Sequence, residues 1–344
     1  MMRNNNKAPS RLDNLTRACV RTTLATGLVA ATLFSASALA EKNLRLAGNF
    51  ATTHSSSVAM EQFKARLPEI SKGALTVDVF PAMQLGGAKE NIDQVRSGVL
   101  EMTWVGASYL SRIVPELEAV SLPFVYANRE EAFKVVDGPV GTLLNEKLAE
   151  KGFVALGFME LGSRQVTNSQ HPIRTLADFD GLKIRLQPNE THLSTFRALG
   201  ASPVSMGINE VYSALQQGVI DGQENPYSVI ETQKFNEVQT YLTDTSHFFD
   251  FIVVVANKRK FDKLDAPEQQ ALREAMGEAV AWQRTKAADE DTAARDKLVA
   301  SNMELVQVSP ELRQQMRERT APVIEALKER IGSDVIDAVL AEVQ

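Results

Sequence analysis

"GFVALGFMELG", residues 152–162, is the stretch that decides the fold. Apart from Glu160 it holds only apolar residues and glycine, which is typical of a strand buried on both faces of a sheet. Strand and helix patterns alternate before it with short turns, which predicts an α/β layer with a largely parallel sheet. The predicted strands of this first block are 43–50, 74–81 and 100–106, and its predicted helices are 56–71 and 91–99.

The same alternation restarts after residue 162. It predicts a strand within 175–188, a helix over 190–200 closed by Gly200, and a helix over 208–218 with Asn209 as its N-cap. A second very apolar run, "FFDFIVVVAN" (248–257), predicts a strand at the core.

The last third of the chain has helical patterns. Asp265, Pro267 and Glu268 form a capping box that predicts the start of a long helix running to about residue 300. Ser309 opens another predicted helix, and 335–343 is a candidate for a third.

Two α/β blocks without a linker between them predict two lobes, joined by several crossings, with a cleft between them. Lobe I is expected over 41–161 plus about 251–290, and lobe II over 162–250 plus about 291–344.

Residues 1–40 carry the pattern of a secretory signal peptide. Five basic residues precede the uncharged stretch 23–40, which ends in an A-x-A motif, so cleavage is expected after Ala40. The alternative is a membrane anchor, because the uncharged run is nearly long enough to span a bilayer. The single cysteine, Cys19, would leave with the signal, so the mature chain would contain no disulfide and no thiol site.

The net charge argues against two classes of partner. The whole chain has a net charge of −6, and removing residues 1–40, with five basic residues and one acidic residue, leaves −10. A chain this acidic is not expected to bind nucleic acid or an anionic membrane surface.

Motifs for catalysis or metal binding are sparse. The four histidines (His54, His171, His192 and His247) lie far apart without metal-ligand spacing, and the sequence contains no P-loop, G-x-G-x-x-G or G-x-S-x-G motif. No cofactor and no metal are therefore expected. A secreted hydrolase that uses paired carboxylates stays open as an alternative.

Two arginines stand at positions where folding does not require them. Arg164 follows the strand 152–162, and Arg185 lies within "GLKIRLQP" (181–188) on the opposite face from Ile184 and Leu186. Strand ends are where α/β folds bind ligands, and a guanidinium matches a carboxylate with two parallel N–H donors. The alternative for each arginine is a salt bridge to a neighbouring acid.

The octapeptide "VIDGQENP" (219–226) places four polar side chains between Ile220 and Pro226. Its composition predicts either a solvated turn or a group of side chains directed at a ligand.

Three quoted stretches make the chain resemble a known family. They are "GSRQVTNSQHPIRTLADFDGLKIRLQPN" (162–189), "ALGASPVSMGINEVYSALQQGVIDGQENP" (198–226) and "QKFNEVQ" (233–239). They resemble the extracytoplasmic solute receptors of tripartite ATP-independent periplasmic (TRAP) transporters, of the dicarboxylate-receptor type. The resemblance runs through the whole mature chain, including "FPAMQLGG" (80–87) and the long C-terminal helix.

The resemblance implies a two-lobed, periplasmic-binding-protein-like fold and a set of ligand-binding residues. Arg185 falls on the arginine that makes the bidentate contact with the ligand carboxylate, and Arg164 falls on one that assists. Asn225 falls on an asparagine that binds the same carboxylate, so 219–226 would be a rigid turn that delivers it to the cleft.

The first lobe is expected to contact the rest of the ligand through Asn49 and Trp104, with Gln187 and His192 as possible partners of hydroxyl groups. The chain departs from sialic-acid receptors of the family at Gly106, Ala88 and Ile208, and we include Ile208 in the predicted site. These departures favour a smaller acid, namely a sugar acid, a uronate or a C4-dicarboxylate.

The function implied is that of a non-enzymatic, monomeric periplasmic receptor that hands its acid to membrane permease subunits. Two alternatives remain, the secreted hydrolase and a receptor that binds the same acid for signalling.

Overall fold

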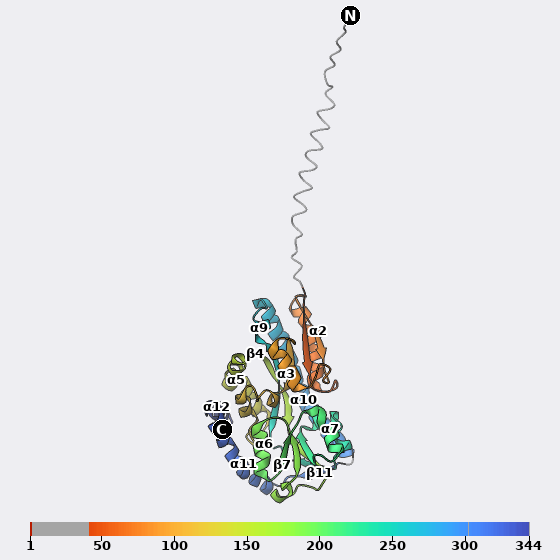
Figure 1. Cartoon of the computed structure of the whole chain (residues 1–344), viewed down its shortest axis with the longest axis vertical. Coiled ribbons are helices and arrows are strands. Elements are labelled where there is room, and N and C mark those ends of the chain that lie inside the picture. The colour runs from red at the N-terminus through yellow and green to blue at the C-terminus, as the bar shows by residue number, and fades with distance from the viewer. Residues whose placement is uncertain (2–40, 302, 344) are drawn as a thin grey trace. The chain divides into compact units, whose positions relative to one another are not determined.

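The computed structural model describes Met1 and residues 41–301 and 303–343. The predicted signal peptide and its cleavage after Ala40 therefore lie outside the described residues, apart from Met1. Residues Lys42–Gln344 form one compact unit, drawn in Figure 1. Across the ranges that the structure describes, no helix combines the length and the apolar character needed to cross a bilayer.

Five strands form sheet A, whose core strand is the predicted run 248–257. The order is β2 (Leu75–Phe80), β1 (Lys42–Gly48), β3 (Met102–Gly106), β10 (Phe249–Asn257) and β4 (Phe153–Ser163). All nine residues of β10 are buried, as the sequence predicts. The prediction of a largely parallel sheet holds only for β2, β1 and β3, because β10 pairs antiparallel with both β3 and β4.

Six shorter strands form sheet B. The order is β11 (Glu304–Gln307), β9 (Tyr241–Asp244), β5 (Gln165–Asn168), β8 (Gly222–Asn225), β6 (Lys183–Leu186) and β7 (Ser202–Ser205). β5 runs antiparallel to both of its neighbours, whereas β6, β7 and β8 are parallel to one another.

The prediction of a turn at 219–226 is wrong. Residues Gly222–Asn225 are the buried strand β8, which lies between β5 and β6. Gly222 permits this, because a Cβ atom there would lie 2.1 Å from the carbonyl oxygen of Thr167 on β5. Asp221, just before the strand, accepts hydrogen bonds from the Lys183 backbone N–H (2.8 Å) and from the Gln170 side chain (3.1 Å).

Helices flank both sheets. They are α2 (Ser55–Ile70), α3 (Ala88–Ser97), α4 (Arg129–Asp137), α5 (Pro139–Glu150), α6 (Glu190–Leu199), α7 (Ile208–Gln216), α8 (Tyr227–Thr232), α9 (Lys258–Phe261), α10 (Ala266–Ala300), α11 (Pro310–Ile331) and α12 (Asp334–Glu342). Short 3₁₀ turns are η1 (Ala107–Tyr109), η2 (Pro115–Ser121), η3 (Leu176–Phe179) and η4 (Phe235–Glu237).

Local capping signals predict several helix ends correctly. Asp265 and Glu268 form the expected capping box of α10, and Ser309 caps α11. Gly200 closes α6 in the left-handed conformation, with φ of 102°. The expected N-cap Asn209 is wrong, because α7 begins at Ile208 after Gly207, whose backbone N–H binds the Glu210 carboxylate.

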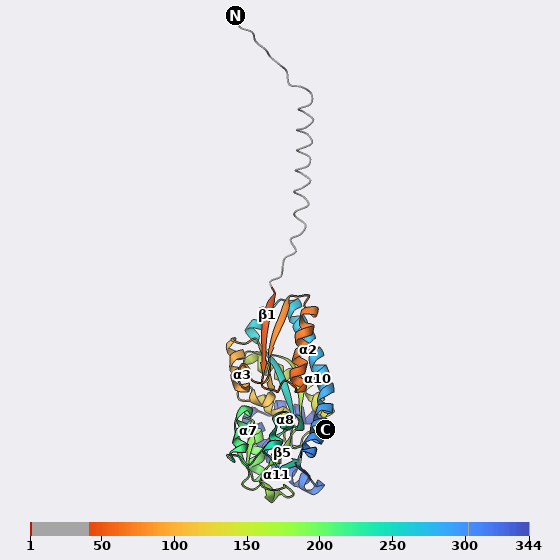
Figure 2. The same ribbon diagram turned by 90° about the vertical axis from the view of Figure 1, so that its right-hand side faces the viewer.

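The 35-residue helix α10 spans both sheets (Figures 1 and 2). It packs against α2 and β4 on the side of sheet A and against α8 on the side of sheet B. Two neighbouring carboxylates secure it: Glu290 accepts from the Ser55 N–H at the start of α2, and Asp291 from the Ser228 N–H in α8. Burial raises the pKa of Asp291 to about 7, against the opposing effect of the Ser228 hydrogen bond.

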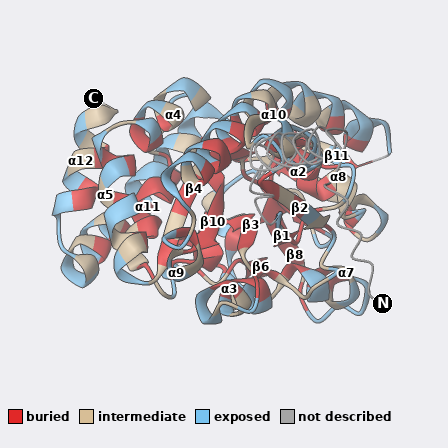
Figure 3. Cartoon of the chain, turned by 90° about the horizontal axis from the view of Figure 1, so that it is seen from above, coloured by how far each residue is buried: buried red, intermediate tan, exposed pale blue. Residues whose placement is uncertain are grey.

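The end of the chain contacts both halves of the unit. α11 packs against α6, whereas α12 packs against α4, α5 and η2, which belong to the part of the chain around sheet A. The lobe boundaries given above stay a prediction, since Lys42–Gln344 clusters as one unit. Figure 3 shows that the buried residues concentrate in the strands and on the inward faces of the helices.

Candidate functional site

A narrow cavity lies between the two sheets, at the carboxyl ends of their parallel strands. Sheet A contributes residues that follow β1 and β3, and sheet B contributes residues at or after the ends of β6 and β8 together with α7 and α8. Its lining consists of Asn49, Phe50, Gly106, Tyr109, Leu161, Gln187, Ile208, Asn225, Val229 and Gln233. We call it the central cavity. Four predicted site residues line it, namely Asn49, Gln187, Ile208 and Asn225.

Arg185 lies beside this cavity as a fully buried cation. Its Nε and Nη2 donate to the Met206 carbonyl oxygen at 3.0 and 2.8 Å, and Nη2 also donates to the Tyr109 hydroxyl oxygen at 2.9 Å. Its Nη1 is buried and has no partner, and no carboxylate of the described residues forms a salt bridge with it. Removing a charge from water costs several kcal/mol unless a counter-charge compensates, so the geometry suits an incoming anion.

Arg164 is equally buried but fully paired. It stands at the single-residue link between β4 and β5, and its Nη2 donates to Glu224 Oε1 at 2.8 Å while its Nε contacts Glu224 Oε2. Its Nη1 lies 3.2 Å from Asp250 Oδ2, and Nη2 also donates to Asn225 Oδ1 at 3.0 Å. The structure therefore places Arg164 in a salt bridge, the alternative open for this residue from the sequence. Its contact with a ligand stays a prediction.

Charge around Arg164 is balanced inside the protein. Burial would raise the pKa of Glu224, but the charge of Arg164 and the hydrogen bonds from His247 and Arg164 lower it to about 2. Burial raises the pKa of Asp250 to about 6 despite the charge of Arg164. Burial also lowers the pKa of His247, although Glu224 Oε2 lies 3.1 Å from its Nε2. With its charge offset by Glu224, Arg164 offers little net charge to a ligand.

Two carboxamides in the central cavity have buried oxygens without partners. These atoms are Asn49 Oδ1 at the end of β1 and Gln187 Oε1 just after β6. Asn225 differs, because its amide is held between Arg164 and Gln223. Buried acceptors without partners are rare in folded proteins and point to a missing hydrogen-bond donor.

Trp104 and His192 lie elsewhere. Trp104 is fully buried beneath Gly48 in the core under α2 and does not line the central cavity. His192 is also buried; its ring stacks on Phe248 at 4.0 Å between centroids and its Nε2 lies 2.8 Å from the Ser121 hydroxyl. Burial lowers the pKa of His192 to about 3, so this histidine is neutral. A ligand contact by Trp104 stays a prediction.

Sequence reasoning missed two polar residues of the cavity. Tyr109 follows β3 within η1, and its hydroxyl joins Arg185 across the gap between the sheets. Gln233 follows α8. Tyr109 comes from a segment without a recognisable ligand motif, although "ASYL" (107–110) does place a tyrosine just beyond a strand end. Gln233 opens the stretch "QKFNEVQ" (233–239), which carries the family resemblance, but the predicted site does not include it.

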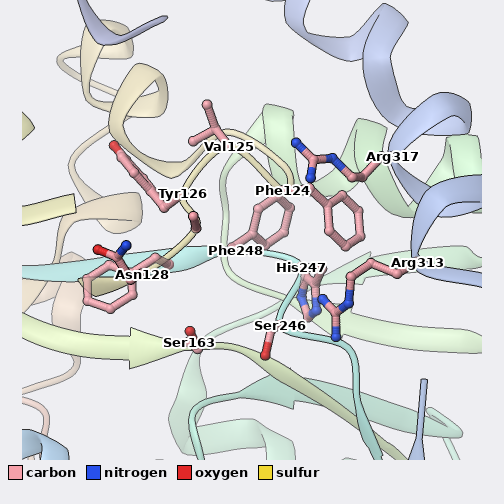
Figure 4. Close-up of a pocket in the computed structure, with 12 residues that line it drawn as sticks. Phe124, Val125, Tyr126, Asn128, Ser163, Ser246, His247, Phe248, Arg313 and Arg317 are labelled. Atoms are coloured by element: carbon pink, nitrogen blue, oxygen red, sulfur yellow. The ribbon is translucent and has the colours of Figure 1, made fainter. Parts of the chain in front are cut away.

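A second pocket lies at the links between the sheets and contains none of the predicted site residues (Figure 4). Phe124, Phe248 and two arginines of α11, Arg313 and Arg317, are among its lining residues. Arg313 donates to the Thr245 carbonyl oxygen at 2.9 Å, so it secures the link before β10. In the described residues, no group of three or more His, Cys, Asp or Glu side chains is arranged to hold a metal ion.

Comparison with known proteins identifies the family. The family model described as bacterial extracellular solute-binding protein, family 7, matches residues 46–330. The chain belongs to this family. Its fold matches that of the sugar acid binding protein DctPAm from Advenella mimigardefordensis, which was solved in complex with galactonate. The two structures superpose with a TM-score of 0.85 at 34% sequence identity, and the match covers 88% of this chain and 98% of DctPAm.

Relatives of this family 7 protein include two named binding proteins. The 2,3-diketo-L-gulonate-binding periplasmic protein YiaO of Escherichia coli is 36% identical over 79% of this chain and 83% of its own length. The C4-dicarboxylate-binding periplasmic protein DctP of Rhodobacter capsulatus is 33% identical over 81% of this chain and 84% of its own length. The prediction of an α/β solute receptor of the TRAP type is confirmed.

Proposed function

We propose that this protein is the periplasmic receptor of a TRAP transporter that captures a small organic acid through Arg185 and delivers it to a membrane permease. The observation that carries the proposal is the buried Arg185 guanidinium, which has no carboxylate partner among the described residues and whose Nη1 is unpaired. A ligand carboxylate would supply the counter-charge and accept from the unpaired nitrogen. Buried polar groups without partners cost stability, so they are expected where a ligand completes them.

The relatives support an organic acid as the ligand. Besides the galactonate complex, similar structures hold β-D-galacturonate in a TRAP protein from a Sulfitobacter and succinate in one from Sulfurospirillum deleyianum, at 27% and 30% identity. These names span sugar acids, uronates and C4-dicarboxylates, the same range that the sequence suggests.

Other parts of the proposal follow the sequence. The mature protein begins after Ala40, acts as a monomer, carries out no catalysis and binds no nucleic acid. Asn225 and Arg164 border the carboxylate, Ile208 limits the shape of the cavity, and Asn49 and Gln187 contact the remainder of the acid.

The lining of the central cavity comes from both sheets, and this supports closure around a ligand. An acid held by Arg185 on the side of sheet B and by Asn49 on the side of sheet A joins the two halves. It drives closure only to the extent that it binds the closed state better than the open one.

A thermal-shift screen of organic acids tests the proposal. An acid present at 100 times its Kd stabilises the protein by about 2.7 kcal/mol, so a true ligand raises the unfolding temperature clearly. Small-angle scattering should then show a smaller radius of gyration with the saturating acid. Absence of any stabilising acid, or turnover of the stabilising acid followed by NMR, would overturn the receptor proposal.

A further inference from the structure

The polar groups in and around the central cavity comprise one cation and several neutral side chains. The cation is Arg185, which donates to the hydroxyl of the lining residue Tyr109 and keeps an unpaired N–H group. The residues that line the cavity itself are all uncharged, and four of them carry carboxamides, Asn49, Gln187, Asn225 and Gln233. The arrangement therefore offers one positive charge and, besides it, neutral hydrogen-bonding groups.

From this arrangement we propose that the ligand is a monocarboxylate rich in hydroxyl groups rather than a C4-dicarboxylate, and that Asn49 and Gln187 select for the hydroxyls. The inference rests on the proposed function, because it assumes that Arg185 holds the first carboxylate.

A second carboxylate would find no counter-charge in the central cavity. Arg164, which is also fully buried, is already paired with Glu224 and Asp250. Desolvating an anion without a partner is costly, so the cavity disfavours a dianion that places both ends inside it.

Cations do occur outside the cavity, in a groove lined by Tyr109 and Ile208 together with the start of α3. They are Lys89 and Arg112, and both side chains belong to exposed residues. Exposed charges are screened by water and bind an anion weakly, so they do not replace a buried partner.

The unpaired carboxamide oxygens call for hydrogen-bond donors. Asn49 Oδ1 and Gln187 Oε1 are buried without partners, and an ionised dicarboxylate without hydroxyls, such as succinate, has no N–H or O–H group to give them. A hydroxyl group both donates and accepts, so it can pair with a carboxamide whichever way round the amide lies. A site with buried polar groups of this kind rejects analogues that lack the matching hydroxyl.

Four acids with six carbons each allow the effect of a second carboxylate on binding to be separated from the effect of hydroxyl groups. D-Gluconate has one carboxylate and hydroxyls, hexanoate has one carboxylate and none, adipate has two carboxylates and none, and galactarate has two with hydroxyls. Calorimetric titration of the full mature chain at pH 7.5 should give the tightest binding for gluconate. We expect hexanoate and adipate to bind at least 100-fold more weakly, and galactarate at least 10-fold more weakly.

Gln187→Met removes the carboxamide at nearly constant volume. It should weaken gluconate binding at least 10-fold and leave hexanoate affinity within threefold, a difference that a general loss of structure would not produce. Gln314→Met is the matched control, because Gln314 is exposed on α11 and lines neither the cavity nor the groove.

The outcomes distinguish this inference from the proposed function. Adipate or succinate binding as tightly as gluconate, with that affinity lost in Arg185→Lys, overturns the choice of ligand class and leaves the receptor proposal intact. Equal losses for gluconate and hexanoate in Gln187→Met overturn the role of Gln187. If no acid binds, or if binding is unaffected by Arg185→Lys, the receptor proposal itself fails.

Discussion

Replacing Arg185 with lysine removes the geometry of the buried cation while keeping its charge. The guanidinium uses Nε and Nη2 for the Met206 carbonyl and the Tyr109 hydroxyl, which leaves Nη1 without a partner among the described residues. A lysine ammonium is a single nitrogen, so it cannot keep these two partners and also place a donor where the separate Nη1 nitrogen of Arg185 stands. Arg185→Lys should therefore behave as a severe substitution.

We expect Arg185→Lys to cost about 2–4 kcal/mol of binding free energy, the scale for disturbing one member of a buried, hydrogen-bonded charge pair. This corresponds to an increase in Kd of about 30- to 700-fold at 25 °C. Isothermal titration calorimetry should use the acid that stabilises the wild-type protein most in the thermal-shift screen.

Arg197→Lys is the matched control for this measurement. Arg197 is an exposed residue of α6 whose ion pair with Glu190 (2.7 Å) lies outside the central cavity, so its Kd should stay at the wild-type value. Circular dichroism of both unliganded variants checks that each is folded. An Arg185→Lys Kd within threefold of wild type would refute the assignment of the carboxylate contact.

Three further outcomes are expected, all measured as free energies of unfolding by denaturant titration. Arg164→Met should lower the unfolding free energy by about 3–5 kcal/mol, because it leaves two buried acids without their cation; a loss below 1 kcal/mol would contradict the pairing described above. The raised pKa of Asp291 means that the folded state holds a proton that the unfolded chain releases, so stability falls as the pH rises from about 4 to about 7. Asp291→Asn should remove this fall and raise the unfolding free energy by about 1–3 kcal/mol at pH 8. An unchanged dependence of stability on pH would argue against a raised pKa of Asp291. Gly222→Ala should lower the unfolding free energy by at least about 2 kcal/mol, since its Cβ would meet the β5 backbone. Gly277→Ala in α10, where a Cβ would meet nothing within 4 Å apart from its own helix, should raise the unfolding free energy by about 0.5–1 kcal/mol, and equal effects of the two substitutions would contradict the steric account.

Features set by neighbouring residues were predicted well from the sequence. The start of α10 depends on Asp265 and Glu268, which are three residues apart, and the end of α6 depends on Gly200 alone. The strand β10 is recognisable because its β-branched and aromatic residues are buried on both faces.

Features set by distant partners were not predicted. The sequence of β8 and its flanks predicts a turn, because it contains the ordinary turn residues Asp221, Gly222, Asn225 and Pro226. Only the pairing of residues 222–225 with β5 and β6 makes them a strand. Tyr109 reaches Arg185 across 76 residues of sequence, so no local pattern could join them. Asn49 and Gln187 entered the predicted site through the family resemblance, whereas their unpaired oxygens are visible only in three dimensions.

The position of β10 between β3 and β4 has a consequence for the growing chain. β3 and β4 are separated by β10, so sheet A stays split until residues 249–257 have been synthesised, and sheet B lacks its outer strand until residues 304–307 follow. α12, near the C-terminus, then covers α4 and α5. No N-terminal fragment that stops before residue 257 can complete either sheet, so stable folding waits for most of the polypeptide.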